Sequence, residues 1–404
     1  MTSKLEGLRH MDVDIPREPT WLGTRLTALA QRLGEAPTGF VVSLACFAFS
    51  LFMIFPMQPA YVLLGGQMDS NTYGDLTYTS RFYFSYLPIS QNPFTKTPTK
   101  YLFTRHRVLG PLIAHYTDLG GRKSVLVPLA ANFLLLWAIY TALRKRDLPY
   151  DLCAIITATM SLTLVVATSQ AWAGYQDSLG CLAIALALCI ESIPLAALAF
   201  LVGMFAEERI LVAGPLFVLW HAMNETDGRW LRRAVLRSAS LVLVLGLWLI
   251  YYIALQHSLS IKLSNVTNVA FEDFRQYKSY VWPGFYYGLR AAWLLPAILV
   301  GRWVLQRGKR GHAALLAASI AVVFIVSLRV GDISRVCCLA FPAVLLGAVY
   351  LYRSGAQSLR YYALAAFALN IVSPCLSVTQ YHMRFFYPLP IAVPELIHQL
   401  RHPG

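Results

Sequence analysis

The sequence contains little charge. Only 13% of its residues are Asp, Glu, Lys or Arg, whereas 57% are hydrophobic, and a soluble domain has about 25% charged residues. The hydrophobic residues form long runs without charge, which is typical of membrane-spanning helices. The composition therefore excludes an ordinary soluble domain and predicts an all-α protein that crosses a membrane many times.

Several motifs are also missing. Neither glycine-rich phosphate loop, GxGxxG or GxxxxGK[ST], is present, so no nucleotide site is expected. The seven cysteines lie in apolar runs and form no CxxC pair, which predicts small buried side chains rather than disulfides. His106, His115, His221 and His257 have no metal-ligand spacing. No cofactor is expected, and the use of a divalent metal is left open.

Positive charge is in excess, with a formal net charge of +14. Binding of nucleic acid would require a polar domain with clustered Lys and Arg, and the sequence has none. The basic residues instead follow the ends of apolar runs, as the positive-inside rule places them. This pattern predicts that the lipid bilayer, and not nucleic acid, surrounds the chain. We expect a multi-pass protein of the bacterial inner membrane, with its active face in the periplasm.

The apolar runs divide the chain into three parts. Residues 1–37 are expected to form a cytoplasmic N-terminal segment, 38–378 a single transmembrane domain with a periplasmic loop at 57–123, and 379–404 a periplasmic tail. Two amphipathic helices, Trp21–Leu33 and Val108–Leu119, are expected outside the spans. We expect about nine to eleven spans. The clearest cover residues 40–55, 125–143, 152–168, 241–255, 289–305, 313–328, 336–352 and 362–378.

One region permits two interpretations. Three short apolar runs lie within residues 179–223, each shorter than the roughly twenty residues that span a bilayer. They are either three short helices beside a water-filled cavity, or one tilted span over 179–205 followed by an interfacial segment at 210–223. Both interpretations leave the next Arg-rich loop in the cytoplasm, so the distribution of charge does not separate them.

The charged residues that remain collect at the non-cytoplasmic ends of the runs. Charges at such positions are costly and mark functional sites. A carboxylate can take a proton from an acceptor hydroxyl, and arginines can bind a phosphate. A groove between helices can hold a polyprenyl tail. These residues therefore suit sugar transfer from a lipid-phosphate carrier. They are Asp69, Asp75, Arg105, Arg107, Asp177, Glu207, Glu208, Arg209, Asp332 and Arg335.

Four short motifs resemble those of bacterial membrane glycosyltransferases of the GT-C superfamily. The long polar stretch after the first span, residues 60–122, carries the first two, and the other two follow on the same expected side of the membrane. They are Gly74-Asp75-x-x-Tyr78, Arg105-x-Arg107-x-Leu109-x-Pro111-Leu112, Glu207-Glu208-Arg209 and Asp332-x-x-Arg335. The resemblance implies a GT-C-like fold, an Asp of the first loop as the general base, and arginines that hold the carrier phosphate.

The roles follow from this resemblance. Asp75 is preferred to Asp69 as the base that deprotonates the acceptor hydroxyl. Arg105, Arg107 and Arg335 are expected to hold the phosphate, while Asp177 and Glu208 orient the sugar or an arginine. The donor would be a polyprenyl-phosphate-linked sugar, and the acceptor a cell-envelope glycan, lipid or protein. A single displacement would make the chain an inverting enzyme.

Structural explanations compete with these roles. Asp75 and Asp177 are residues that also cap helices. Arg105 and Arg107 are placed to contact lipid headgroups, and Asp332 and Arg335 are spaced for a local ion pair. For the whole chain, the alternatives are a transporter or flippase of a lipid-linked or polar solute, and a non-catalytic membrane subunit of a polysaccharide synthesis system.

Overall fold

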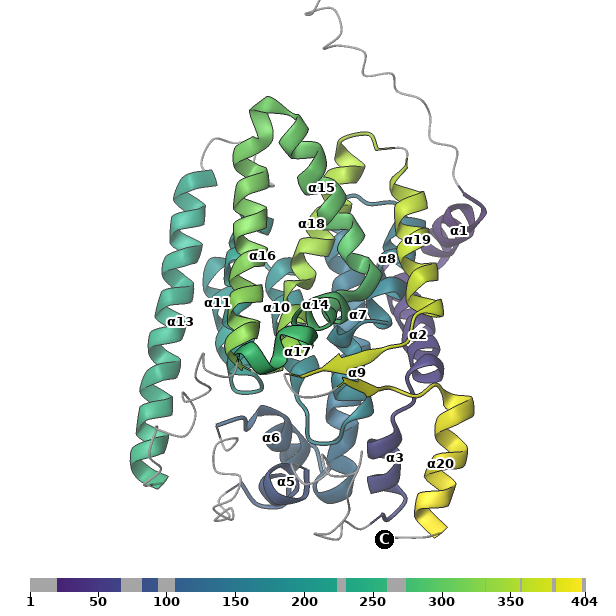
Figure 1. Ribbon diagram of the computed structural model, residues 1–404, viewed down its shortest axis with the longest axis vertical. Coiled ribbons are helices and arrows are strands. Elements are labelled where there is room, and N and C mark those ends of the chain that lie inside the picture. The colour runs from purple at the N-terminus through teal and green to yellow at the C-terminus, as the bar shows by residue number, and fades with distance from the viewer. Residues whose placement is uncertain are drawn as a thin grey trace, which may run out of the picture.

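A computed structural model describes residues 20–66, 82–93, 106–223, 230–259, 274–330, 332–356, 358–379 and 383–401. Long apolar helices stand side by side and form a bundle (Figure 1). Short helices cover its lower end in that view: α3 (Met57–Leu63), α5 (Leu87–Gln91), α6 (Leu109–Tyr116) and α20 (Leu389–Arg401). The predicted polar stretch after the first span therefore contributes a helical layer at one end of the bundle.

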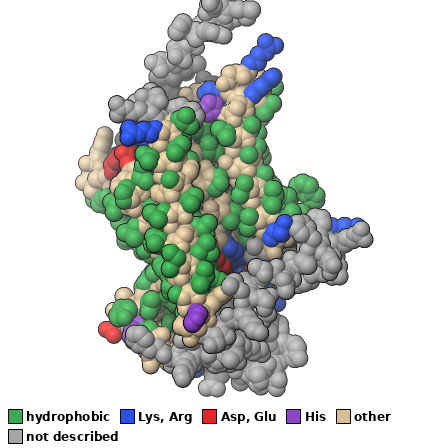
Figure 2. All heavy atoms as spheres, turned by 90° about the vertical axis from the view of Figure 1, so that its left-hand side faces the viewer, with side chains coloured by type: hydrophobic (Ala, Val, Ile, Leu, Met, Phe, Trp, Pro, Cys, Tyr) green, Lys and Arg blue, Asp and Glu red, His purple; other side chains and the backbone are tan. Residues whose placement is uncertain are grey.

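Among the described residues, six segments are long and apolar enough to cross a membrane. They are Glu35–Met53, Gly121–Arg144, Leu231–Ser258, Lys278–Leu305, Arg307–Arg329 and Ile333–Arg353. The pair α8 (Tyr150–Ser161) and α9 (Leu164–Ala171) adds a seventh if it is one span, bent by 46°. Figure 2 shows one long side of the bundle, which is covered mainly by hydrophobic side chains and carries Lys and Arg at its upper end. The described helices therefore have the composition and length of a polytopic all-α membrane protein.

The spans are built from the following helices: α2 (Glu35–Met53), α7 (Leu126–Arg144), α13 (Trp230–Leu259), α14 (Phe274–Leu289), α15 (Leu294–Leu305), α16 (Arg310–Val330), α17 (Ile333–Cys337) and α18 (Phe341–Arg353). Three further apolar helices are shorter, α10 (Asp177–Cys189), α11 (Ile193–Met204) and α19 (Leu359–Val372). The remaining pieces are α1 (Trp21–Leu33), π-helix η2 (Phe82–Tyr86), α12 (Gly214–Ala222) and the 3-10 turns η4 (Gly121–Val125), η5 (Glu208–Ala213), η8 (Arg290–Trp293), η9 (Arg307–Lys309) and η10 (Cys338–Ala340).

The structure separates the two interpretations of residues 179–223. Helix α10 ends at Cys189 and α11 begins at Ile193, with Pro194 in its first turn. Proline lacks a backbone N–H, so it is accepted there but not inside a continuous helix. A single tilted span over 179–205 is therefore wrong, and the region forms separate short helices.

The last span was also placed too far along the chain. Helix α19 ends at Val372, and the chain then forms a hairpin of β1 (Leu376–Val378) and β2 (Met383–Phe385). The strands are antiparallel, with Leu376 opposite Phe385. Pro374 lies between the helix and the first strand, and a residue before proline avoids the helical conformation. The predicted span over 362–378 is therefore wrong in its last six residues.

Small residues set the spacing at the centre of the bundle. A Cβ added to Gly203 would lie 2.4 Å from the Cβ of Ala183, and one added to Gly180 would lie 2.7 Å from a methyl group of Ile210. Helix α11 and the turn η5 therefore approach α10 more closely than larger side chains would permit. Membrane helices use glycine and alanine for such close packing, because lipid supplies no hydrophobic driving force between them.

We expect Gly203→Ala to destabilise the protein. The added methyl group meets Ala183 in a packed interior, and overpacking costs about 1–3 kcal/mol. The matched control is Gly246→Ala on α13, because a Cβ at Gly246 would meet nothing within 4 Å. The midpoint of thermal unfolding in detergent should fall for Gly203→Ala and stay constant or rise for Gly246→Ala. Equal midpoints for the two variants would contradict the close packing.

Candidate functional site

Seven of the predicted site residues lie together at the lower end of the bundle. Four separate segments bring them there: the residues before α6, the start of α10, the junction of α11 with η5, and α17 with the residue that precedes it. We call them the charge network: Arg107, Asp177, Glu207, Glu208, Arg209, Asp332 and Arg335. The other three predicted residues, Asp69, Asp75 and Arg105, lie outside the described residues.

Arg335 forms the most complete contacts of the charge network. Its Nη2 donates to both oxygens of Asp177, at 2.9 and 3.0 Å, and its Nη1 donates to Asp332. The guanidinium lies 4.5 Å from the ring centroid of Tyr175, a cation–π contact. Two carboxylates and a ring face thus surround a cation that is buried in the bundle. Arg335 fixes the start of α10 to α17.

Arg107 forms a second centre around the paired glutamates. Its Nη2 donates to Glu208 Oε1 at 2.6 Å and its Nε donates to Glu208 Oε2 at 2.9 Å, which is a bidentate contact. Its Nη1 lies 2.9 Å from Glu207 Oε2. Nε2 of His106 also lies 2.9 Å from Glu208 Oε2. The two glutamates therefore hold the segment before α6 against the junction of α11 and η5.

Arg209 connects these two centres. Its Nε donates to Glu207. Its two terminal amines are less engaged, because Nη2 lies 3.8 Å from Asp177 and Nη1 lies 3.8 Å from Asp332. Both distances exceed the length of a hydrogen bond. Within the described part of the chain, Arg209 is thus the arginine of the charge network with donors left to bind another group.

The charge network is buried on one side and exposed on the other. The side chains of Glu207 and Arg335 are buried, whereas those of Glu208 and Asp332 are 25% and 31% exposed. Burial disfavours ionisation of Glu208, but Arg107 and His106 outweigh that cost and hold the pKa of its carboxyl well below its usual range. Glu208 is therefore an anion near neutral pH. Four carboxylates and three guanidinium groups leave the charge network close to neutral.

Three neighbours of the charge network were not predicted. His106 binds Glu208, and Tyr175 lies under Arg335. The side chain of Gln176 accepts from the Gly110 amide at 2.8 Å and donates to the Arg107 carbonyl at 2.8 Å. It therefore ties the start of α6 to the link before α10. In the sequence, the only feature that could have identified His106, Tyr175 and Gln176 is that each lies next to or near a predicted charged residue.

The link that carries Tyr175 and Gln176 depends on one glycine. Gly174 has a φ of +81°, a backbone conformation that residues other than glycine rarely adopt. A Cβ at this position would also lie 2.9 Å from the backbone of Phe82. The chain can therefore turn tightly after α9 and present Tyr175, Gln176 and Asp177 to the charge network in sequence.

The charge network offers groups for acid–base and anion contacts. Among the described residues, no group of three or more His, Cys, Asp or Glu side chains is placed to hold a metal ion. The network can orient a hydroxyl through Glu208 or Asp332 and can bind an anion through Arg209. No family model, curated protein or solved structure matches this chain.

We expect Arg335→Gln to lower the free energy of unfolding by about 3–5 kcal/mol, because it leaves the buried Asp177 carboxylate without its main partner. The double variant Asp177→Asn/Arg335→Gln should cost less than the sum of the single variants. The control is Glu35→Gln, which removes the partner of Arg144 from a pair whose glutamate is 67% exposed. Such a pair contributes less than about 1 kcal/mol. Additive costs, measured by denaturant unfolding, would contradict a direct pairing of Asp177 with Arg335.

Acid should remove the contribution of Glu208 to stability. The folded-state pKa of this carboxyl lies below its ordinary value of 4.5. The ionised contact is therefore fully stabilising above pH 4.5 and is lost as the pH falls below that value towards the folded-state pKa. The unfolding midpoint of Glu208→Gln should lie below that of the wild type at pH 7, and the gap should close below pH 4.5. A gap that does not depend on pH would exclude Glu208 as the titrating group.

Proposed function

We propose that the chain is a membrane glycosyltransferase that moves a sugar from a polyprenyl-phosphate carrier to an acceptor on the periplasmic face. One observation carries this proposal. Charged residues of three separate motifs, which include Arg107, Glu208 and Arg335, belong to one network at one end of an apolar bundle. A lipid phosphate and a polar acceptor can both reach such a place, because it lies where the apolar interior ends.

The charge network suggests which arginine faces the phosphate. Arg107 and Arg335 already hold two carboxylates each, so we assign them to positioning. Arg209 has terminal amines without a hydrogen bond among the described residues. A guanidinium binds phosphate through two parallel N–H groups, and its charge stabilises the departing phosphate. In this proposal Arg209 therefore contacts the carrier phosphate.

An apolar groove next to η5, the turn that contains Arg209, suits the carrier's hydrocarbon tail. Its volume is about 450 Å³, and it lies between η5, α12, α13 and α16. Its lining includes Leu211, which follows Arg209 by two residues in the sequence, together with Val218 and Leu241. Ser238 and Ser319 are its only hydroxyl-bearing lining residues in the described part of the chain. An apolar tail could therefore extend from the phosphate into the bundle.

The remaining roles fall on residues of the first loop. Asp75, or Asp69 in its place, would take the proton from the acceptor hydroxyl as its oxygen attacks the anomeric carbon. The bond from that carbon to the phosphate oxygen breaks, and polyprenyl phosphate leaves with the electron pair. A single displacement of this kind inverts the anomeric configuration. The proposed architecture is GT-C-like, with nine to eleven spans if the short apolar helices also cross the bilayer.

One observation favours a transporter as the second candidate. Helices α8 and α9 form a pair bent by 46°, and transporters often build their sites from broken helices. The bend lies between Ser161 and Leu164, whereas the charge network lies beyond the other end of α9. We therefore rank transport of a lipid-linked or polar solute below sugar transfer.

A deletion strain complemented with variants tests the proposal. Asp75→Asn should abolish transfer, and Arg209→Gln should lower it by about a hundredfold, the scale of one lost transition-state contact. Arg122→Gln is the control, because Arg122 lies in η4 outside the charge network. The measurements are the sugars of the cell surface, the pool of carrier-linked sugar and the amount of protein in the membrane.

Each outcome separates the candidates. Loss of one surface sugar with accumulation of its carrier-linked form supports a transferase. Full rescue by Arg209→Gln, Asp75→Asn and Asp69→Asn would contradict an enzyme and favour a non-catalytic subunit. Carrier-linked sugar that is trapped on the cytoplasmic side of the membrane would favour a flippase. An unchanged anomeric configuration in the product would exclude the single displacement.

A further inference from the structure

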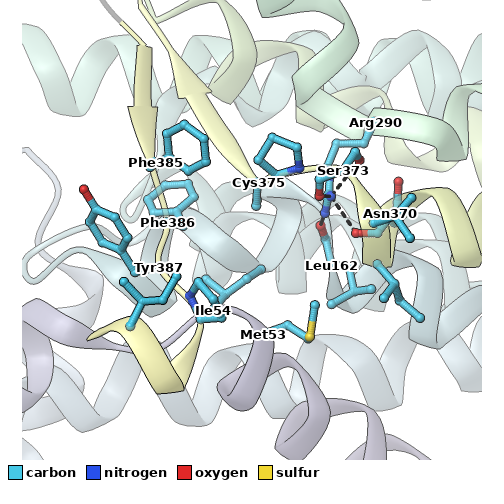
Figure 3. A pocket seen from close by; sticks show the side chains of 15 residues that line it. Met53, Ile54, Leu162, Arg290, Asn370, Ser373, Cys375, Phe385, Phe386 and Tyr387 are labelled. Atoms are coloured by element: carbon cyan, nitrogen blue, oxygen red, sulfur yellow. Dashed lines mark hydrogen bonds between the residues drawn. The ribbon is translucent and has the colours of Figure 1, made fainter. Parts of the chain in front are cut away.

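A second cavity lies away from the charge network and shares no residue with it. Its volume is about 430 Å³, within the range of small-molecule sites. It is bounded by the end of α2, the end of α19, the strand β2 and the start of α20. Figure 3 shows its two different ends. Arg290, Asn370 and Ser373 gather at one end, whereas Phe385, Phe386 and Tyr387 lie at the other.

Arg290 occupies an unusual position in this cavity. Its side chain is buried, and its φ of +54° is rare for a residue other than glycine. Such a conformation is strained and persists only where the surroundings impose it. The guanidinium donates to the carbonyls of Leu162, Asn370 and Ser373. Leu162 and Ser373 follow the last turns of α8 and α19, so these helix C-termini hold the cation in place.

In the described part of the chain, the guanidinium of Arg290 is contacted by carbonyl dipoles and not by ionised groups. Among the described residues no carboxylate forms an ion pair with it, and its Nε has no hydrogen-bond partner. This contrasts with Arg107 and Arg335, which are each paired with two carboxylates. A buried cation without a counter-ion is costly. An anionic group at this end of the cavity would supply the missing charge.

The cavity opens on the outer surface of the protein. Three apolar side chains at its edge are exposed, namely Val372, Phe385 and Ile391. Met53 and Val372 are the last residues of α2 and α19, so the cavity lies at the level where these two helices end. Headgroups are expected at this level, and hydrocarbon chains lie beside the helices. A bilayer lipid can therefore reach the cavity from the side.

We propose that this cavity binds an anionic phospholipid of the surrounding bilayer. The phosphate lies at the end with Arg290 and Ser373, and an acyl chain packs against Phe385, Phe386 and Ile391. The cavity combines an apolar wall with a cation that has no ion-pair partner among the described residues, so it suits one anionic amphiphile. This inference does not depend on the proposed transfer of sugar, because no residue of the charge network takes part.

The test uses the full chain, purified and stripped of lipid. Phosphatidylglycerol, phosphatidylcholine of the same chain length, and a polyprenyl phosphate are titrated separately, with binding followed by native mass spectrometry. The variant Ile391→Trp narrows the mouth of the cavity. Its matched control is Ile397→Trp on the same helix, because the two residues are 57% and 44% exposed and only Ile391 lines the cavity.

Phosphatidylglycerol should bind the wild type more tightly than phosphatidylcholine, by about tenfold for one charge-assisted contact. Ile391→Trp should weaken that binding, and Ile397→Trp should not. Arg290→Gln, if it folds, should lose the preference for the anionic lipid. The proposal is overturned if the two phospholipids bind equally, if both tryptophan variants behave alike, or if only the polyprenyl phosphate binds.

Discussion

The buried pairing of carboxylates with guanidinium groups constrains this structure most strongly. An ion removed from water costs several kcal/mol, and only close opposite charges recover that cost. Arg335 therefore requires Asp177 and Asp332, and Arg107 requires both glutamates. Because these residues belong to four separate segments, the segments must pack together for any of the charges to be tolerated. Small residues such as Gly203 permit that approach.

Stability alone does not explain the charge network. Replacing a buried ion pair by apolar residues of similar volume is often neutral or stabilising, so buried charges are weak evidence of a stabilising purpose. The charge network also stops short of complete pairing. Among the described residues, the terminal amines of Arg209 form no hydrogen bond and lie 3.8 Å from Asp177 and Asp332, and Glu208 and Asp332 remain partly exposed. A purely structural network would engage these donors as fully as those of Arg335. The incomplete pairing supports the proposal that a ligand binds here.

The sequence predicted where the helices lie better than where they end or which side chains pair with one another. Hydropathy located α1 at Trp21–Leu33, because an amphipathic pattern depends only on local order. It left open the break before α11, where Pro194 lies in the first turn of the helix, and it extended the last span past Pro374, beyond the end of α19. The predicted residues of the charge network do lie together, and Asp332 pairs with Arg335 as their three-residue spacing indicated, but the pairs between distant segments followed no sequence rule. Arg335 contacts Asp177 across 158 positions of the chain, and only tertiary packing determines such a distance.

A continuous row of aromatic side chains connects the two sites. Phe386 lines the cavity that contains Arg290, and its ring centroid lies 5.1 Å from that of Trp172. The ring centroid of Trp172 lies 5.1 Å from that of Tyr175. The ring of Tyr175 in turn lies under Arg335. Contact alone does not transmit free energy, because transmission requires a row that has two arrangements. All three rings are buried, so they cannot move independently in a packed interior. If a lipid shifts Phe386, Trp172 and Tyr175 must therefore shift with it, and the position of Tyr175 relative to Arg335 is the point where the two sites would be coupled.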